Sequence, residues 1–188
     1  MSKPNTWNRD LFAQTWHFAT LKHSGQSYGG RLPEQQIDYI NHLSSVAMEA
    51  MWVLANSTET YHADLLLQCA LLHDTLEDTA TDFEELSTTF GLPVAEGVLA
   101  LTKNKTLSDK NQQMLDSLQR IQQQPKEIWM VKMADRTTNL YHPPYYWNKT
   151  KIAAYRAEAQ IIYDHLASAD ALMAQRLAEK IEAYQAFL

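Results

Sequence analysis

The chain has 188 residues, of which 45% are hydrophobic and 20% are charged, so it fits one folded domain and does not have a disordered composition. Its few glycines (5) and prolines (6) exclude an all-β sandwich, which needs frequent turns. A net charge of −6 argues against a protein dedicated to binding nucleic acid, and no apolar run is long enough to span a membrane. The single cysteine, Cys69, and the lack of an N-terminal apolar segment predict a cytoplasmic protein.

The apolar residues recur with helical periodicity, and glycine and proline interrupt it, which predicts one all-α domain of eight or nine helices. In chain order the predicted helices cover residues 8–23, 34–55, 62–76, 81–91, 94–101, 108–123, 126–140, 147–166 and 169–188. Residues 27–33 are predicted to be a loop, and Thr81 with Glu84 fits a capping box that opens the fourth helix. The last helix is amphipathic without a basic face, so we expect it to pack on the domain or on a second subunit.

Four charged or metal-ligating side chains lie close together in the segment His73-Asp-Thr-Leu-Glu-Asp78. Two leucines just before it predict that this end of the helix is buried, and a buried charge must be paired or must bind a metal ion. Helical spacing places Glu77 one turn after His73, and Asp78 one turn after Asp74. The alternative interpretation is an acidic helix end that faces solvent.

Two further polar residues interrupt apolar helices elsewhere in the chain. Asp135 follows Val131 and Met133, and an acidic side chain in that position needs a partner. Asn139 lies one turn later, where its amide can orient this carboxylate or a substrate group. His42 by itself is interpreted as a core histidine with satisfied hydrogen bonds, but the three sites together fit one metal-binding scheme.

Three segments in combination, Tyr39-Ile-Asn-His42, Ala70-Leu-Leu-His-Asp-Thr-Leu-Glu-Asp-Thr79 and Lys132-Met-Ala-Asp-Arg-Thr-Thr-Asn139, resemble the HD-domain hydrolases. Within them, the second segment is most similar to the alarmone hydrolases of the RelA/SpoT type, especially the small stand-alone ones similar to metazoan SpoT homologue. The resemblance covers about residues 18–166, and residues 167–188 form the predicted C-terminal packing helix. It implies that residues 1–188 are one HD-type helical bundle, a metal-dependent phosphohydrolase domain.

The resemblance also implies a role for each residue of the site. One divalent metal ion, typically Mn²⁺, is expected to be held by His42, His73, Asp74 and Asp135. Glu77 and Asp78 are expected to position and deprotonate the attacking water without binding the metal. The residues expected to contact substrate are Lys22, Lys105, Asn139, Lys151 and Tyr155. For Arg136, pairing with the acidic residues Glu77 or Asp78 and a structural role are equally compatible with its position.

The implied reaction is hydrolysis of the 3′-pyrophosphate of a guanosine tetra- or pentaphosphate, which releases pyrophosphate and GDP or GTP. The segment from Gln26 to Tyr39 departs from the family pattern because it is longer and lacks the usual basic pair. The base therefore stays open between guanine and adenine, and the 2′-phosphate of NADPH is an alternative target. Two other functions also stay open: an HD phosphatase that removes a single phosphate from a nucleotide, and a catalytically silent module that binds one. The expected partner is a small nucleotide, and a homodimer is compatible with the last helix.

Overall fold

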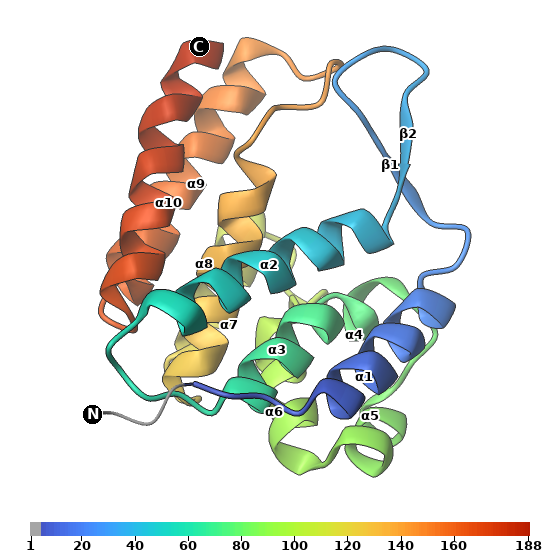
Figure 1. Cartoon of the computed structure of the whole chain (residues 1–188). Helices are drawn as coiled ribbons and strands as arrows, with labels where there is room; N and C mark the ends of the chain where they lie inside the picture. Colours follow the sequence, from blue (N-terminus) through green and yellow to red (C-terminus); the bar gives the residue numbers. More distant parts are fainter. Residues whose placement is uncertain (1–4) are drawn as a thin grey trace.

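The computed structural model describes residues 5–188, so the first four positions of the predicted domain lie outside it. This part of the chain forms ten α-helices, one two-stranded β-hairpin and a final 3₁₀ helix (Figure 1). In chain order the elements are α1 (Arg9–Lys22), β1 (Ser27–Gly29), β2 (Gln36–Asp38), α2 (Ile40–Asn56), α3 (Ala63–Leu72), α4 (Thr75–Asp78), α5 (Phe83–Phe90), α6 (Leu92–Leu101), α7 (Lys110–Ile121), α8 (Lys126–Asn139), α9 (Lys149–Leu166), α10 (Ala171–Ala183) and the 3₁₀ helix η1 (Tyr184–Phe187). The prediction of an all-α bundle is confirmed.

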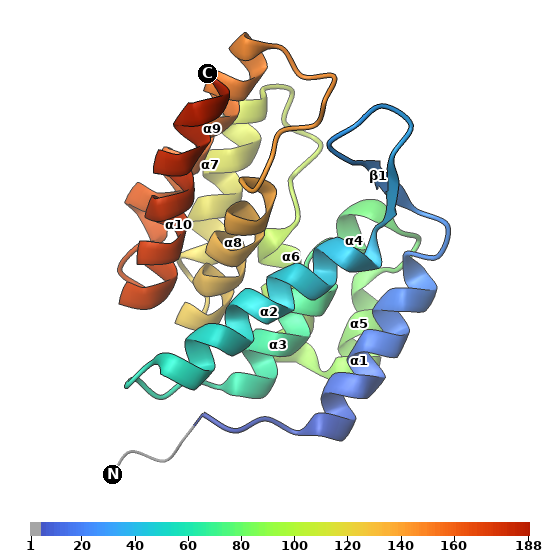
Figure 2. The ribbon, with the colours of Figure 1, turned by 45° about the horizontal axis from the view of Figure 1, so that its top comes forward.

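The helices α2, α3 and α8 pack against one another at the centre of the bundle. Their facing sides carry Leu43, Leu66 and Met130, which have no exposed surface. Helices α1, α5 and α6 lie on one side of this centre, and α9 and α10 lie on the other (Figures 1 and 2). The same three central helices carry or adjoin the candidate metal ligands, so close packing of the core fixes the relative positions of these ligands.

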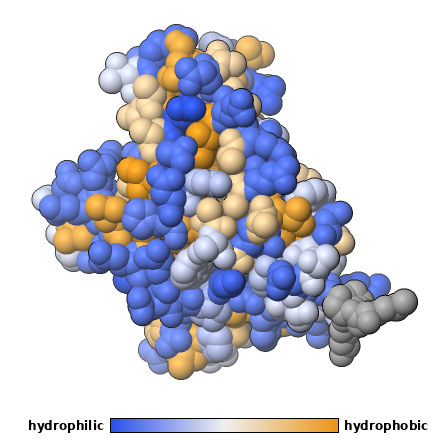
Figure 3. All heavy atoms as spheres, turned by 90° about the vertical axis from the view of Figure 1, so that its left-hand side faces the viewer, coloured by the Kyte–Doolittle hydropathy of each residue, from blue (hydrophilic) through white to orange (hydrophobic). Residues whose placement is uncertain are grey.

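None of the helices over residues 5–188 combines the length and the apolar character that crossing a membrane requires. Helix α10 buries Met173, Leu177 and Ile181 against its neighbours, which agrees with the amphipathic pattern predicted for the last helix. Figure 3 shows the side of the molecule that lies to the left in Figure 1, where hydrophilic residues predominate and smaller hydrophobic patches lie between them.

The helix predicted over residues 62–76 is divided into α3 and α4, and this division raises the helix count to ten. Asp74 lies at the break with φ −100° and ψ 0°, outside the helical conformation. The ring atom Nδ1 of His73 lies 2.9 Å from the carbonyl oxygen of Ala70, one of the acceptors that a helix end leaves free. The break thus places His73 and Asp74 at the junction of α3 and α4 and not inside a continuous helix.

The second predicted helix begins later than expected, and part of the predicted loop before it is a hairpin. Strand β2 covers residues 36–38 and pairs antiparallel with β1, so that Tyr28 is the partner of Ile37. Glu34 has φ 68°, a left-handed conformation that is incompatible with a continuous helix, and α2 begins only at Ile40. The predicted helical start at residue 34 is wrong because strands of three residues carry too little periodicity to be recognised.

The capping box predicted at Thr81 is displaced by one residue. Asp82 is the N-cap of α5, and its Oδ1 accepts the backbone N–H of Glu85 at 2.8 Å. The Thr81 hydroxyl instead accepts a hydrogen bond from Thr79 Oγ1 at 3.0 Å. An aspartate satisfies the free N–H groups of a helix start as well as a threonine does, so the helix itself is present as predicted.

A buried ion pair fastens α10 to α2. Glu49 is 3% exposed, and its carboxylate accepts hydrogen bonds from Arg176 at 2.7 and 3.0 Å. The hydroxyl of Tyr141, which follows α8, donates to the same carboxylate at 3.0 Å. This network therefore connects the C-terminal helix to two of the helices that carry the candidate site.

Replacing Glu49 by alanine is expected to lower the free energy of unfolding by about 2 kcal/mol, because Arg176 and Tyr141 lose the buried carboxylate that they share and Arg176 keeps only Glu179 as a charged partner. Glu49→Gln keeps the shape and part of the hydrogen bonding, so it should destabilise the protein less. Chemical denaturation followed by circular dichroism measures both variants. A loss below about 1 kcal/mol for Glu49→Ala, which is typical of an exposed pair, contradicts this role.

Candidate active site

Three potential metal ligands from separate parts of the chain meet at one point. His42 comes from α2, His73 follows α3 and Asp135 comes from α8, and all three are buried. The Nε2 atoms of His42 and His73 lie 3.2 Å apart. Asp135 Oδ1 lies 3.4 Å from His42 Nε2 and 3.8 Å from His73 Nε2. Ligand atoms gathered this closely form a group that can hold a metal ion.

Asp74 adds a fourth donor to this group. Its Oδ2 atom lies 3.1 Å from His73 Nε2 and 3.7 Å from His42 Nε2. Carboxylates suit ions such as Mg²⁺ and Mn²⁺, and imidazoles suit the later first-row metals, so the mixed set fits a divalent transition metal. The residues present therefore fit the kind of ion that the sequence predicts. We call His42, His73, Asp74 and Asp135 the His/Asp centre.

The charges of these side chains agree with a cation site. Burial alone lowers the pKa of His73, but the carboxylates of Asp74 and Asp135 outweigh burial and raise this pKa to about 9. Burial also opposes ionisation of Asp74, yet the neighbouring His73 holds the pKa of Asp74 well below its usual range. The pKa of Asp135 is likewise lowered against the effect of burial, first of all by Lys132. The carboxylates are thus anionic at neutral pH, and a cation that binds here displaces the proton of His73.

Neighbouring donors hold each carboxylate of the His/Asp centre in place. The Tyr39 hydroxyl donates a hydrogen bond of 2.5 Å to Asp74 Oδ2. On Asp135, Asn139 Nδ2 donates to Oδ1 at 2.7 Å, and Lys132 Nζ donates to Oδ2 at 2.9 Å. Partners of this kind fix the orientation of metal ligands and tune their affinity. Of the two roles predicted for Asn139, contact with a carboxylate is the one observed.

His23 and Gln26 connect the end of α1 to the same centre. The buried His23 ring stacks on the Tyr39 ring, with the ring centroids 5.0 Å apart. His23 Nδ1 lies 2.8 Å from Gln26 Oε1, and Gln26 Nε2 donates to the carbonyl oxygen of Asp78 at 2.6 Å. The segment after α1 therefore supports both Tyr39 and the turn that carries the acidic pair.

Glu77 and Asp78 lie together on the single turn α4. Glu77 Oε1 lies 2.9 Å from Lys103 Nζ, and Glu77 Oε2 accepts the backbone N–H of Lys103 at 3.2 Å. Burial, together with the negative charges of Asp74 and Glu77, raises the pKa of Asp78. A carboxylate paired with a cation, beside a carboxyl group of raised pKa, is suited to moving a proton to and from a bound water.

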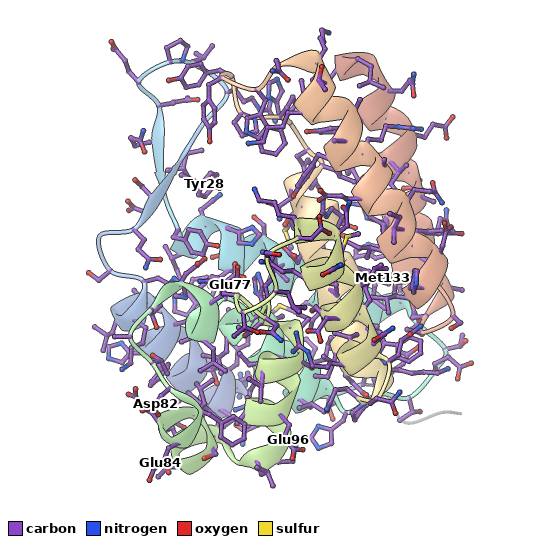
Figure 4. All side chains as sticks on the ribbon, turned by 180° about the vertical axis from the view of Figure 1, so that it is seen from behind. Tyr28, Glu77, Asp82, Glu84, Glu96 and Met133 are labelled. Atoms are coloured by element: carbon purple, nitrogen blue, oxygen red, sulfur yellow. The ribbon has the colours of Figure 1, made fainter. Side chains whose placement is uncertain are left out.

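The His/Asp centre and the acidic pair line one pocket of about 730 Å³. The β-hairpin and the loop between α8 and α9 complete its wall and contribute Tyr28 and Tyr146. A Cβ atom on Gly29 would lie 3.4 Å from Tyr146 Cε1, so the hairpin touches this loop. In Figure 4, Tyr28 lies on the hairpin side of the pocket and Glu77 on the helical side. A pocket of this size accommodates a nucleotide.

Two of the predicted substrate contacts, Asn139 and Tyr155, line this pocket, whereas Lys22, Lys105 and Lys151 are not among the residues that line it. Asn139 reaches it from the last turn of α8, next to Asp135. Tyr155 reaches it from α9, where burial raises the pKa of its hydroxyl and keeps the phenol neutral.

Each of the three predicted lysines has a partner within the protein. Lys22 Nζ pairs with Glu85 Oε1 at 2.6 Å on the surface formed by α1 and α5. Lys151 Nζ lies 4.4 Å from the centre of the Trp147 ring. Lys105 Nζ donates to the carbonyl oxygen of Glu77 at 2.9 Å, so among the three it is the one in contact with the acidic turn.

The sequence left two roles open for Arg136: pairing with Glu77 or Asp78, and a structural role. In the structure its partners are residues of α9 and not Glu77 or Asp78. Its guanidinium lies over the Tyr155 ring, 3.9 Å from the ring centroid. Its Nη2 atom lies 3.5 Å from Glu158 Oε2, and Nη1 donates to the carbonyl oxygen of Tyr155 at 3.3 Å. Arg136, a residue of α8, therefore connects this helix to α9, which carries both Tyr155 and Glu158.

Three residues for which no role was predicted also line the pocket: Tyr39, Lys103 and Lys132. Tyr39 lies three residues before His42, and this spacing places the two side chains on one side of the helix start. Helical spacing could therefore have indicated that Tyr39 lies near the metal ligands. Lys103 lies in a loop after α6, where no periodicity relates it to Glu77, and only the packing of α6 near α4 brings the two together. Lys132 lies three residues before Asp135, which is also a detectable helical pair.

Comparisons with known proteins place this chain in a family. Residues 15–172 match the family model described as HD domain. A relative from Danio rerio, named guanosine-3′,5′-bis(diphosphate) 3′-pyrophosphohydrolase MESH1, is 32% identical over 89% of this chain and 90% of its own length. The Homo sapiens protein of the same name is 33% identical over 73% of this chain and 74% of its own length.

The fold comparison agrees with the sequence comparison. A solved structure, described as a metazoan orthologue of SpoT that hydrolyses ppGpp, superimposes with a TM-score of 0.78 and 26% identity. The alignment covers 95% of this chain and 97% of that one, so the helical bundle is shared over nearly its whole extent. The chain belongs to the HD-domain family, in which the relatives named above are MESH1 proteins.

Proposed function

We propose that this chain is a metal-dependent hydrolase that removes the 3′-pyrophosphate of a guanosine tetra- or pentaphosphate and releases pyrophosphate with GDP or GTP. The observation that carries this proposal is the position of the acidic pair beside the His/Asp centre, in one pocket of nucleotide size. The similarity to proteins named as guanosine-3′,5′-bis(diphosphate) 3′-pyrophosphohydrolases supports the same substrate class.

The acidic pair supplies the proton transfers that this reaction needs. Water attacks the phosphorus bonded to the ribose O3′, the O3′–P bond breaks, and one water proton must finally reach O3′. Glu77, whose carboxylate is paired with Lys103, accepts a proton from the attacking water. Asp78, whose pKa is raised, is suited to hold a proton at its carboxyl group and return it.

The four residues of the His/Asp centre would hold one divalent ion, for which we propose Mn²⁺. Such an ion, when bound, lowers the pKa of water, polarises a phosphoryl oxygen and offsets the negative charge of the pocket. Asn139 and Tyr39 keep the carboxylates of Asp135 and Asp74 oriented for that role.

For substrate contacts we propose Asn139 and Tyr155, which line the pocket, and Lys105, which touches the acidic turn. Lys22 and Lys151 are proposed with them on the resemblance alone, and each must leave its present partner to reach a nucleotide. The hairpin brings Tyr28 to the pocket, where the basic pair usual in the family is missing. Aromatic rings stack on any base, so this wall by itself does not favour guanine over adenine.

The test incubates purified protein and Mn²⁺ with equal concentrations of ppGpp, ppApp and NADPH, and ion-exchange chromatography resolves the products. We expect pyrophosphate together with GDP, and GDP or ADP in the product identifies the base that is preferred. Phosphate without pyrophosphate would replace this proposal by the single-phosphate phosphatase. Intact metal binding without any turnover would replace it by the silent nucleotide-binding module.

We further propose that residues 1–188 act as one HD-type domain in the cytoplasm and that the protein acts on a small nucleotide and not on nucleic acid. Residues 167–188 are proposed to be the packing helix of this domain, which is supported by the buried face of α10. A homodimer is proposed as the form in solution. Light scattering coupled to size-exclusion chromatography distinguishes it from a monomer of 21.6 kDa.

A further inference from the structure

The pocket is lined by several cationic side chains, and these differ in the protein groups that they already contact. Over residues 5–188 these lysines and arginines are Arg31, Lys103, Lys132 and Arg136. Lys132 Nζ is held by Asp135 Oδ2 at 2.9 Å, and Arg136 is held by the Tyr155 ring and by Glu158. Arg31 lies in the hairpin turn between β1 and β2. Lys103 is the member of this group that contacts the acidic pair.

Lys103 lines the pocket, and its contacts with Glu77 do not use all of the donors of its ammonium group. Its backbone N–H and its Nζ atom both donate to Glu77, at 3.2 and 2.9 Å. The side chain of Lys103 is nevertheless 50% exposed, whereas that of Glu77 is 14% exposed. An ammonium group has three N–H donors, so after the contact with Glu77 it can still donate to other acceptors. The same side chain can therefore hold Glu77 and a phosphate oxygen together.

We propose that Lys103 binds the terminal phosphate of the 3′-pyrophosphate and so makes the site selective for a 3′-diphosphate over a 3′-monophosphate. The inference rests on the proposed function and adds to it a specificity residue. Phosphate oxygens accept charge-assisted hydrogen bonds from an ammonium group, and these bonds are stronger than neutral ones. Because Lys103 is bonded to Glu77, the phosphate that it holds lies beside the carboxylate that activates water. A nucleotide with only one 3′-phosphate has no second phosphate for Lys103 to hold.

The first test compares steady-state kinetics of the Mn²⁺-loaded wild type, Lys103→Met, Lys103→Arg and Lys110→Met with ppGpp. Lys110 is an exposed lysine at the start of α7 and is not among the residues that line the pocket, so its variant is a matched control. We expect Lys103→Met to raise KM about tenfold, the effect of losing one charge-assisted hydrogen bond, and Lys103→Arg to recover most of it. Lys110→Met should leave KM unchanged. A fall in kcat with unchanged KM overturns the proposal, because it shows that Lys103 only positions Glu77.

The second test measures binding without turnover, in the Glu77→Gln background. Equilibrium dialysis gives the Kd of ppGpp and of guanosine 5′-diphosphate 3′-monophosphate, with and without Lys103→Met. We expect Lys103→Met to weaken ppGpp about tenfold and to leave the monophosphate unchanged. Equal effects on both nucleotides, or no effect on either, overturn the proposal, as does the failure of ppGpp to bind. If binding depends on Lys103 but the wild type does not hydrolyse ppGpp, the proposed function fails and the assignment of Lys103 holds.

Discussion

The Asp135→Ala variant is expected to lose metal binding and hydrolysis together. Asp135 supplies one oxygen to the His/Asp centre, and its other oxygen is bonded to Lys132. Removing the carboxylate takes away a ligand and leaves the Lys132 ammonium as an uncompensated charge beside the centre, which repels a cation. We expect the affinity for Mn²⁺ to fall by at least about 100-fold and kcat/KM by at least about 1000-fold.

Isothermal titration calorimetry with Mn²⁺ and an assay of released pyrophosphate measure the two effects. Asp164→Ala is the matched control, since Asp164 is an exposed carboxylate on α9 that is not among the pocket residues. Circular dichroism shows whether each variant is folded. If Asp135→Ala binds Mn²⁺ within a few-fold of the wild type, Asp135 is not a ligand of this centre.

The Glu77→Gln variant is expected to separate metal binding from turnover. Glu77 is outside the group of ligand atoms, so the affinity for Mn²⁺ should stay within about threefold of the wild type. An amide cannot accept a proton from water, and loss of a general base lowers kcat by about 10² to 10⁴-fold. The amide also loses the charge that pairs with Lys103, although it is of nearly the same size.

The matched control for this variant is Glu96→Gln, an exposed carboxylate on α6 that Figure 4 shows at the end of the molecule remote from Tyr28. Its kcat should equal that of the wild type. Retained turnover in Glu77→Gln removes Glu77 from the activation of water and shifts the role to Asp78. A large loss of Mn²⁺ affinity would instead place Glu77 among the ligands.

Three of the metal-ligand candidates could be singled out because each of them contradicts its local pattern, and the resemblance to the HD-domain hydrolases then implied that they bind one metal ion. His42, His73 and Asp135 are polar residues on helix faces that are otherwise apolar, and the structure buries all three. Such residues need a partner, and a shared cation satisfies them at once. The break at Asp74 was not predicted, because residues 73 and 74 carry no helix-breaking side chain, and the contacts observed at the break include groups distant in the chain, such as Tyr39 and His42 on Asp74.

The substrate side of the pocket was harder to predict. Lys22 and Lys151 were assigned from the resemblance to the family, and in the structure they contact Glu85 and Trp147. Lys103 received no role, yet it is the lysine that reaches Glu77. A lysine has a long flexible side chain, so its sequence position says little about which acceptor it meets.

The assignment of His42, His73, Asp74 and Asp135 to one metal site came from the resemblance to the HD-domain hydrolases. By itself, the sequence determined the helical class, the order of the helices and the polar residues that interrupt apolar helices. These features depend on periodicity and on single polar residues in apolar segments, which are local properties of a chain. Only the tertiary structure decided that residues 27–38 form a hairpin over the pocket, that Tyr39 supports Asp74, and that Lys103 pairs with Glu77. The contacts of Tyr39 with Asp74 and of Lys103 with Glu77, and the contact of the hairpin with Tyr146 that sets it over the pocket, join residues far apart in the chain. Such contacts are fixed by the packing of the core and not by local sequence.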